Sequence, residues 1–179
     1  MGDPKKQRKK FFSPAKRWSK ERIDTEKDLT KEYGLKNKKE IWKAEFKLRN
    51  FTRQAKRLIS ISTKQAEREK EQLLSKLKSL SLLSATAGME NILDLRINAI
   101  LDRRLQTLVY KKGISKSVKA ARQMITHGHI LVNKVKVTIP SYLIKSEEEQ
   151  SITVYQDSPF SDSMHPEMKK EKKTIKVGE

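Results

Sequence analysis

The chain has 179 residues, and its 41 Lys and Arg against 22 Asp and Glu give it a formal net charge of +19. It contains no cysteine, which excludes disulfides and thiolate metal sites and is typical of a reducing compartment. No apolar run approaches the roughly 20 residues of a membrane span, and the first residues lack the apolar segment of a signal peptide. We therefore expect a soluble protein of the cytosol.

The excess positive charge is concentrated in two blocks. Residues 1–57 carry 20 basic and 8 acidic side chains and residues 91–145 carry 11 and 2, whereas residues 58–90 are nearly neutral and 146–179 slightly acidic. Such a charge repels itself in a compact chain unless a polyanion screens it, and nucleic acid is the usual polyanion. A surface charged only for solubility would spread the excess more evenly. The pattern favours nucleic-acid binding.

Residues 1–18 are predicted to form an extended basic arm, because their two prolines resist helix formation. Phe11, Phe12 and Trp18 lie among the basic residues, and such rings either stack on bases or pack on the protein body. A solvated, disordered tail is the alternative, but aromatic side chains are costly to leave in water. The arm residues expected to bind RNA are Lys5, Lys6, Arg8, Lys9, Lys10, Arg17 and Trp18.

A helical region is predicted over residues 19–97. Ser19 can cap a first helix that ends at Gly34, and Asn37 with Glu40 has the spacing of a capping box that opens a second. Behind it, apolar residues recur at steps of three and four, which predicts a helix of about 20 residues with one apolar stripe. The stripe consists of Ile41, Ala44, Leu48, Phe51, Ala55 and Leu58.

A third helix is predicted to open at residues 62–65. An antiparallel pair of residues 38–58 and 63–80 would bury the apolar seams of both helices. A long coiled coil is the alternative, but the two runs are too short and a break at 59–62 separates them. Residues 81–91 are expected to be a link. The seam of the third helix consists of Ala66, Leu73, Leu77 and Leu80.

Residues 98–156 are predicted to form a compact unit of two helices and a small antiparallel sheet, which makes the fold class α+β. The first helix is expected over residues 98–111 and the second from a Ser115 cap to Gly128. The second helix has hydrogen-bonding side chains on the face opposite its apolar residues. They are Lys119, Arg122, Gln123 and Thr126.

After Gly128 the apolar period changes from helical to alternating, which indicates strands. We expect one strand at 130–132 and another at 135–139, joined by a tight hairpin turn at Asn133–Lys134. A third strand is expected at 151–155. The remaining residues, 157–179, are predicted to be a polar tail.

His127 and His129 flank Gly128, and close histidines can bind metal or move protons. A metal site needs more than two ligands one residue apart, and the third histidine, His165, is distant in the sequence. No nucleophile is suggested beside them. Gly128 instead suits the left-handed residue that ends a helix. We therefore expect no metal and no cofactor, and two histidines that can donate hydrogen bonds to RNA.

Residues 101–144 resemble the S-four RNA-binding domain, through the "RRL" of the first helix, the "ARQ-I-HGHI-VN" core and the following "V-IP-S". Residues 20–60 are similar to the N-terminal region of the S-four family of small-subunit ribosomal proteins, in its archaeal and eukaryotic-like form. The closest pieces are "YGLKNKKEIW" and "LRNFTRQAKRL". The resemblance implies a helical N-terminal domain at 19–97 and a compact RNA-binding domain, like the α-L motif, at 98–156.

The resemblance implies a structural constituent of the small ribosomal subunit rather than an enzyme. Members of the family bind 16S rRNA at a multi-helix junction of its 5′ domain and nucleate subunit assembly. They lie where mRNA enters the subunit, beside the S-five and S-three proteins, and contribute to translational accuracy. Carried over by position, the RNA contacts are Arg49, Arg53, Lys56 and Arg57 in the helical domain, and Arg103, Arg104, Lys112, Lys116, Lys119, Arg122, Gln123, Thr126, His127 and His129 in the other.

Two features depart from the family. Many bacterial members bind zinc through N-terminal cysteines, which this chain lacks. Members commonly have Gly where Lys134 stands, so the hairpin turn is expected to be of another type or strained. Two other function classes fit the sequence less well. An RNA-modifying or tRNA-charging enzyme would need a phosphate-binding loop or a set of catalytic residues, and the sequence shows neither. A heat-shock-type or nucleoid RNA-binding factor would differ in abundance, because it would be present in fewer copies than the subunit.

Overall fold

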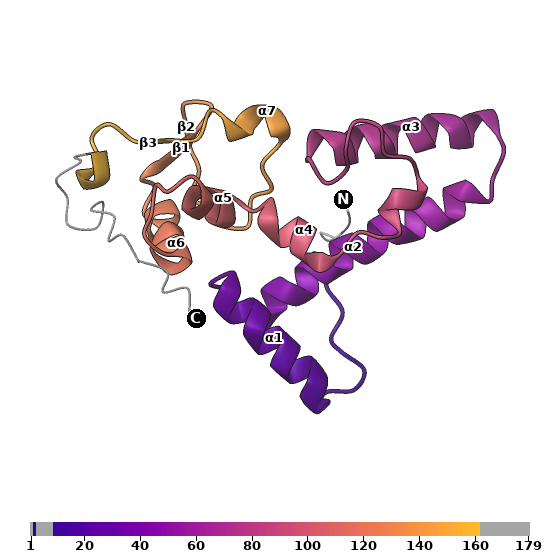
Figure 1. The fold of residues 1–179 in the computed structure, drawn as a ribbon, viewed down its shortest axis with the longest axis horizontal. Helices are drawn as coiled ribbons and strands as arrows, with labels where there is room; N and C mark the ends of the chain where they lie inside the picture. Colours follow the sequence, from indigo (N-terminus) through magenta and orange to yellow (C-terminus); the bar gives the residue numbers. More distant parts are fainter. Residues whose placement is uncertain (1, 3–8, 162–179) are drawn as a thin grey trace, which may run out of the picture. The chain divides into compact units, whose positions relative to one another are not determined.

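The computed structural model describes residue 2 and residues 9–161. This part of the chain forms seven α-helices, two short 3-10 helices and one three-stranded antiparallel sheet (Figure 1), which confirms the α+β class. The chain divides into two compact units, Met1–Arg103 and Arg104–Glu179, named here the helical unit and the C-terminal unit. No described helix is long and apolar enough to cross a membrane. Lys5, Lys6 and Arg8 of the arm, and tail residues 162–179, lie outside the described residues.

In the helical unit, α1 (Lys20–Glu32) and α2 (Lys38–Ile59) begin after the predicted caps, Ser19 and Asn37. The Asn37 side chain does not bond to the helix backbone, so the predicted capping box is wrong. The Glu40 N–H donates instead to the Asn37 carbonyl (3.0 Å). The apolar stripe is confirmed: five of its six residues are buried, and Leu48 is half-buried.

The third helix, α3 (Lys64–Ser79), packs along α2 as predicted (Figure 1). Its cap is Thr63, whose hydroxyl accepts from the Ala66 N–H (3.2 Å). Leu73 and Leu77 are buried in the seam. The link that follows contains a short 3-10 helix, η1 (Glu90–Ile92), which also packs on α2.

The helix predicted over residues 98–111 is wrong, because two helices stand in its place. They are α4 (Ile97–Asp102), which packs on α2 in the helical unit, and α5 (Leu105–Lys111) in the C-terminal unit. Between them Arg104 is extended (φ −72°, ψ 142°) and forms a β-bridge with Leu143. The Leu105 N–H donates to the Tyr142 carbonyl (2.8 Å). Pairing with a distant segment thus replaces helical bonds at this point, and the division between the units falls here rather than at residue 98.

The C-terminal unit contains α5, α6 (Val118–Thr126), α7 (Ser146–Glu149) and the strands β1 (Ile130–Val132), β2 (Val135–Lys136) and β3 (Thr153–Val154). The strand order is β2-β1-β3, with Val132 opposite Val135 and Ile130 opposite Val154. The three strands were predicted, but β2 is shorter than residues 135–139. The Val137 N–H still donates to the Ile130 carbonyl (3.2 Å), but further along the chain the carbonyls of Pro140 and Tyr142 accept from the start of α5 instead of from β1. The short helix α7 was not predicted.

The core of the C-terminal unit lies between the helix pair α5–α6 and the sheet. Ile125 of α6 and Ile130 of β1 are fully buried in it, and burying such a side chain stabilises a fold by roughly 1.5–3 kcal/mol. This packing fixes the orientation of α6. The core consists of Leu105, Leu108, Val109, Ala121, Met124, Ile125, Ile130, Val132, Ile144 and Ile152.

Candidate nucleic-acid interface

The helix α6 begins after Ser117, and the predicted Ser115 cap is wrong. Ser117 is extended, and its Oγ accepts from the Ala120 N–H (3.1 Å). Ser115 is buried, and its hydroxyl donates to the Ser117 carbonyl (3.2 Å). The two-residue shift shortens the helix but leaves the same residues on each of its faces.

The two faces of α6 have opposite character. Ala121, Met124 and Ile125 are buried in the core, whereas the opposite face is exposed. The Thr126 hydroxyl donates to backbone carbonyls of its own helix (3.0 and 3.1 Å), so it offers lone pairs outward rather than a proton. The exposed residues of this strip are Lys116, Lys119, Gln123, Thr126 and His127, and Lys112 is exposed at the end of α5.

Arg122 is half-buried on α6 and contacts a buried glutamine. Its Nη1 donates to Gln106 Oε1 (3.4 Å), and Gln106 Nε2 in turn donates to the Val118 carbonyl (3.0 Å). Gln106 is only 1% exposed. It therefore supports the arginine from inside the unit. Sequence reasoning missed Gln106, since nothing in the pattern of α5 marks a glutamine as buried.

The end of α6 forms a Schellman motif, which confirms that Gly128 ends the helix. Gly128 has a φ of +76°, its N–H donates to Ile125 and the His129 N–H donates to Met124 (both 3.0 Å). A side chain at Gly128 would meet only Thr138 Cγ2, 3.9 Å away. The backbone conformation, not lack of space, therefore favours glycine.

The two histidines stack at this turn, with ring centroids 6.2 Å apart. His127 is exposed, whereas His129 Nδ1 lies 3.0 Å from the Ser158 Oγ and its ring meets the edge of Phe160. Burial lowers the pKa of His129, and the charges of His127 and Lys136 lower it further. His127 is therefore accessible to a partner, while His129 is partly occupied within the unit.

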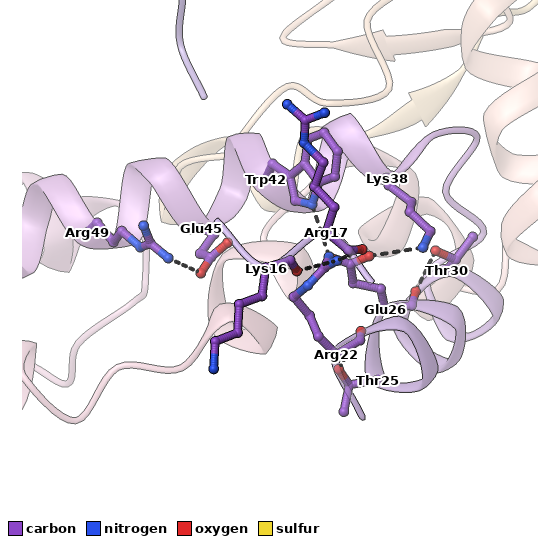
Figure 2. Close-up of polar contacts among 10 residues, drawn as sticks. All are labelled: Lys16, Arg17, Arg22, Thr25, Glu26, Thr30, Lys38, Trp42, Glu45 and Arg49. Carbon is purple, nitrogen blue, oxygen red and sulfur yellow. Dashed lines mark hydrogen bonds and ion pairs between the residues drawn. The ribbon is translucent and has the colours of Figure 1, made fainter. Parts of the chain in front are cut away.

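The predicted basic face of α2 is exposed throughout. Arg49 Nη2 lies 2.6 Å from Glu45 Oε1, one turn earlier (Figure 2). An exposed pair of this kind contributes little free energy, so a phosphate can compete for the arginine. The face consists of Arg49, Arg53, Lys56 and Arg57.

The described part of the arm places its aromatic rings in two different environments. Phe11 stacks on Trp42 (centroids 6.1 Å apart) and Phe12 meets Phe46 edge-on (5.2 Å), so both pack on α2. Trp18 is 90% exposed. Lys9, Lys10 and Arg17 are exposed as well. Trp18 is therefore the ring most available to stack on a base, while Phe12 remains 56% exposed despite its contact with Phe46.

Comparison with known proteins places this chain in a family. The S4 domain matches residues 103–149. The small ribosomal subunit protein uS4 of Methanococcus vannielii is 48% identical over 168 residues, which are 93% of this chain and 94% of the relative. That of Methanococcus maripaludis strain C5 is 46% identical with the same coverage, and that of Picrophilus torridus is 47% identical over 93% of this chain and 92% of the relative. The chain belongs to the uS4 family.

Within this uS4 chain, the two arginines that open the S4 domain differ from the α6 strip. Arg103 is half-buried and Arg104 is only 4% exposed. Both were carried over as RNA contacts from the family pattern. Because so little of Arg104 is exposed, its side chain is not presented at the surface of the free protein. Arg104 is therefore not part of the interface that we propose.

The hairpin turn of this uS4 chain is strained rather than of another type. Asn133 and Lys134 have φ values of 51° and 65°, and Val132 pairs with Val135, as a type I′ turn requires. The Asn133 N–H donates to the Ser151 Oγ (3.2 Å), which holds the turn against β3. Lys134 thus adopts a conformation that glycine would adopt at lower cost.

Proposed function

We propose that this protein is a structural constituent of the small ribosomal subunit that binds small-subunit rRNA. The observation that carries the proposal is the extent of the similarity. The S4 domain alone spans residues 103–149, and a factor of another kind could hold such a domain. The identity to uS4 proteins instead covers 93% of the chain, so it includes the helical unit with its own basic face.

The mechanism is architectural. A folded RNA is recognised by its shape, its phosphate positions and its exposed bases rather than through the deep groove of a helix. On α6, Arg122 can donate bidentate hydrogen bonds to two phosphate oxygens from a fixed position, whereas Lys119 acts as a point charge. Gln123, Thr126 and His127 add neutral hydrogen-bonding groups beside them. The α2 face and the arm supply further cations for phosphates.

We infer that the RNA target is the multi-helix junction in the 5′ domain of 16S rRNA, and that binding there nucleates assembly of the subunit. The same inference places the protein in the cytoplasm, near the site where mRNA enters the subunit. Its neighbours would be the S-five and S-three proteins, and it would contribute to translational accuracy. Family membership supports this placement. The role needs no cofactor, membrane or small-molecule substrate, and it is not enzymatic.

The alternative is a heat-shock-type RNA-binding factor that associates with ribosomes only at need. The two functions differ in copy number, which sucrose-gradient sedimentation of unstressed cell extract measures. A structural constituent co-sediments with small subunits at about one copy each and remains bound in moderate salt. A protein found well below one copy per subunit, or only after heat stress, would instead be the factor.

A further inference from the structure

A buried carboxylate organises the start of the helical unit. Glu26 of α1 is only 5% exposed. Its Oε1 accepts from Arg22 and from Trp42 Nε1 (3.0 Å), and its Oε2 lies 3.1 Å from Lys38 Nζ (Figure 2). Burial raises the pKa of Glu26, but the hydrogen bonds from Trp42, Lys38 and Arg22 outweigh burial and leave it below its usual value. Glu26 is therefore charged at neutral pH. We name Glu26, Arg22, Lys38 and Trp42 the Glu26 cluster.

Arg22 connects this cluster to the backbone of the arm. While its Nη1 pairs with Glu26, its Nη2 donates to the carbonyls of Arg17 (2.7 Å) and Lys16 (3.3 Å) (Figure 2). The planar guanidinium carries donors that point in several fixed directions, so one side chain can join a carboxylate to two carbonyls. A lysine ammonium is a single point and cannot span both.

Trp42 makes a second connection between the cluster and the arm. The same indole that donates to Glu26 stacks on Phe11. The arm is thus attached by its backbone at residues 16–17 and by a ring at residue 11. The side chains of Lys9, Lys10, Arg17 and Trp18 remain exposed between and beside these attachments. The cluster holds the backbone of the arm and leaves its cations and its exposed indole outward.

We propose that the Glu26 cluster holds residues 9–18 of the basic arm in their RNA-binding conformation before RNA arrives. Glu26 and Arg22 are positioning residues, and Arg17 and Trp18 are the groups that they position. The inference rests on the proposed rRNA-binding function. Holding a segment in its bound conformation removes the entropic cost of ordering it during association. Glu26 is buried and negatively charged, so it acts through the arm rather than by touching RNA.

This role can be separated from simple electrostatics because the two predict opposite signs. Removing a negative charge from a cationic protein should strengthen RNA binding, whereas releasing the arm should weaken it. The variant Glu26→Gln tests this against Asp24→Asn, which makes the same charge change in the same helix. Asp24 forms an exposed pair with Lys27 (3.0 Å) and makes no bond to the described arm residues 9–18.

The measurement is the affinity for folded small-subunit rRNA over a range of salt concentrations. We expect Glu26→Gln to bind about tenfold more weakly. Its dependence on salt should also be shallower, because fewer arm cations meet phosphates. Asp24→Asn should bind as well as the unchanged protein or slightly better. Equal or tighter binding by Glu26→Gln would overturn the proposal.

A second pair of variants leaves the net charge unchanged. Arg22→Lys keeps the positive charge but loses the planar guanidinium that joins Glu26 to the arm carbonyls. Arg68→Lys, on the exposed face of α3, is its control. We expect Arg22→Lys to bind RNA about fivefold more weakly and to be cut faster by trypsin at Lys16 and Arg17, while its circular dichroism is unchanged. If Glu26→Gln fails to fold, this pair carries the test. Unchanged affinity and unchanged cleavage would overturn the proposal.

A double-mutant cycle completes the test. In a protein that already carries Arg17→Ala and Trp18→Ala, adding Glu26→Gln should have little further effect on RNA affinity, because the groups that the cluster positions are gone. An effect as large as in the unchanged protein would contradict a positioning role. Failure of the unchanged protein to bind rRNA would instead overturn the proposed function, so the two failures are distinguishable.

Discussion

The basic faces of α2 and α6 are built differently. The α2 face repeats one kind of group, a cation, along a 22-residue helix that is held by its own apolar stripe. The α6 face is carried by a nine-residue helix, and it mixes cations with an amide, a hydroxyl and an imidazole. A helix this short is marginal alone, so its orientation depends on the sheet, the Schellman turn and Gln106. We propose that α2 supplies charge for phosphates and that α6 supplies oriented hydrogen bonds that recognise the shape of the RNA.

Neutralising the α2 face should produce the largest effect. In a triple variant, Arg53→Gln, Lys56→Gln and Arg57→Gln, about three phosphate contacts are lost, and rRNA affinity should fall roughly a hundredfold at moderate salt. The slope of log affinity against log salt should become shallower by up to about three. A matched triple on α3, at Lys64, Arg68 and Lys78, should cost much less. An equal loss for both triples would show that only net charge matters.

A single substitution on α6 should have the next largest effect. Arg122→Ala removes a charge-assisted contact from a supported position, and we expect about tenfold weaker rRNA binding. The fold should remain intact, because Arg122 is only half-buried and does not belong to the core cluster of the unit. Filter binding with circular dichroism measures both. Unchanged binding by the folded variant would make the assignment of the α6 face wrong.

Gln123→Ala tests the chemical difference between the two faces. The amide carries no charge and releases no counterions, so its loss should weaken binding about threefold and leave the salt dependence unchanged. The same titration series as for the α2 triple provides the measurement. A shallower salt slope for Gln123→Ala would remove the distinction between a charge face and a hydrogen-bonding face.

The hairpin behind α6 offers a test of how that helix is supported. Lys134→Gly relieves the backbone strain of a left-handed residue and should raise the free energy of unfolding of the C-terminal unit by about 1 kcal/mol. Lys134→Ala removes the same charge but keeps the Cβ, so it should give no gain. Hydrogen exchange of amides in β1 and α6 measures the effect, and α2 should be unaffected. A similar gain for both variants would indicate charge rather than strain.

The smallest expected effect concerns His129. Its folded pKa lies below the usual 6.5, so the unfolded chain takes up the proton first as the pH falls. The stability of the C-terminal unit should therefore be full above about pH 6.5 and decline below it. His129→Gln should flatten this decline in melting temperature between about pH 7 and 5.5. If His129→Gln leaves this decline unchanged, titratable groups other than His129 cause the loss of stability.

Much of the fold follows from apolar periodicity. The stripe of α2 and the alternation in β1 are strong local signals, and both elements are where the pattern places them. The break at Arg103–Arg104 could not be predicted in this way, because a β-bridge to Leu143 replaces helical bonds that the local sequence favours. The choice of Ser117 over Ser115 as a cap has the same origin. Both residues are serine, and only the folded unit buries one of them.

In the candidate site, too, some features follow from the local sequence and others depend on tertiary contacts. The exposed strip on α6 follows from the spacing of its residues, so the sequence predicts it. Two other features depend on contacts between segments that are distant in the sequence. They are the burial of Arg104, which is only 4% exposed, and the hydrogen bond by which Gln106 supports Arg122. Arg22 and Glu26 have the spacing of a helical ion pair. The bonds from Arg22 to the arm carbonyls are tertiary, and the sequence gives no sign of them.

The most direct test of rRNA binding through clustered cations is the salt dependence of the affinity of the full chain for folded small-subunit rRNA. The affinity should fall steeply as salt rises, with a slope of log affinity against log salt of about −6 or steeper, because many phosphate counterions are released together. A nearly flat dependence would contradict the account.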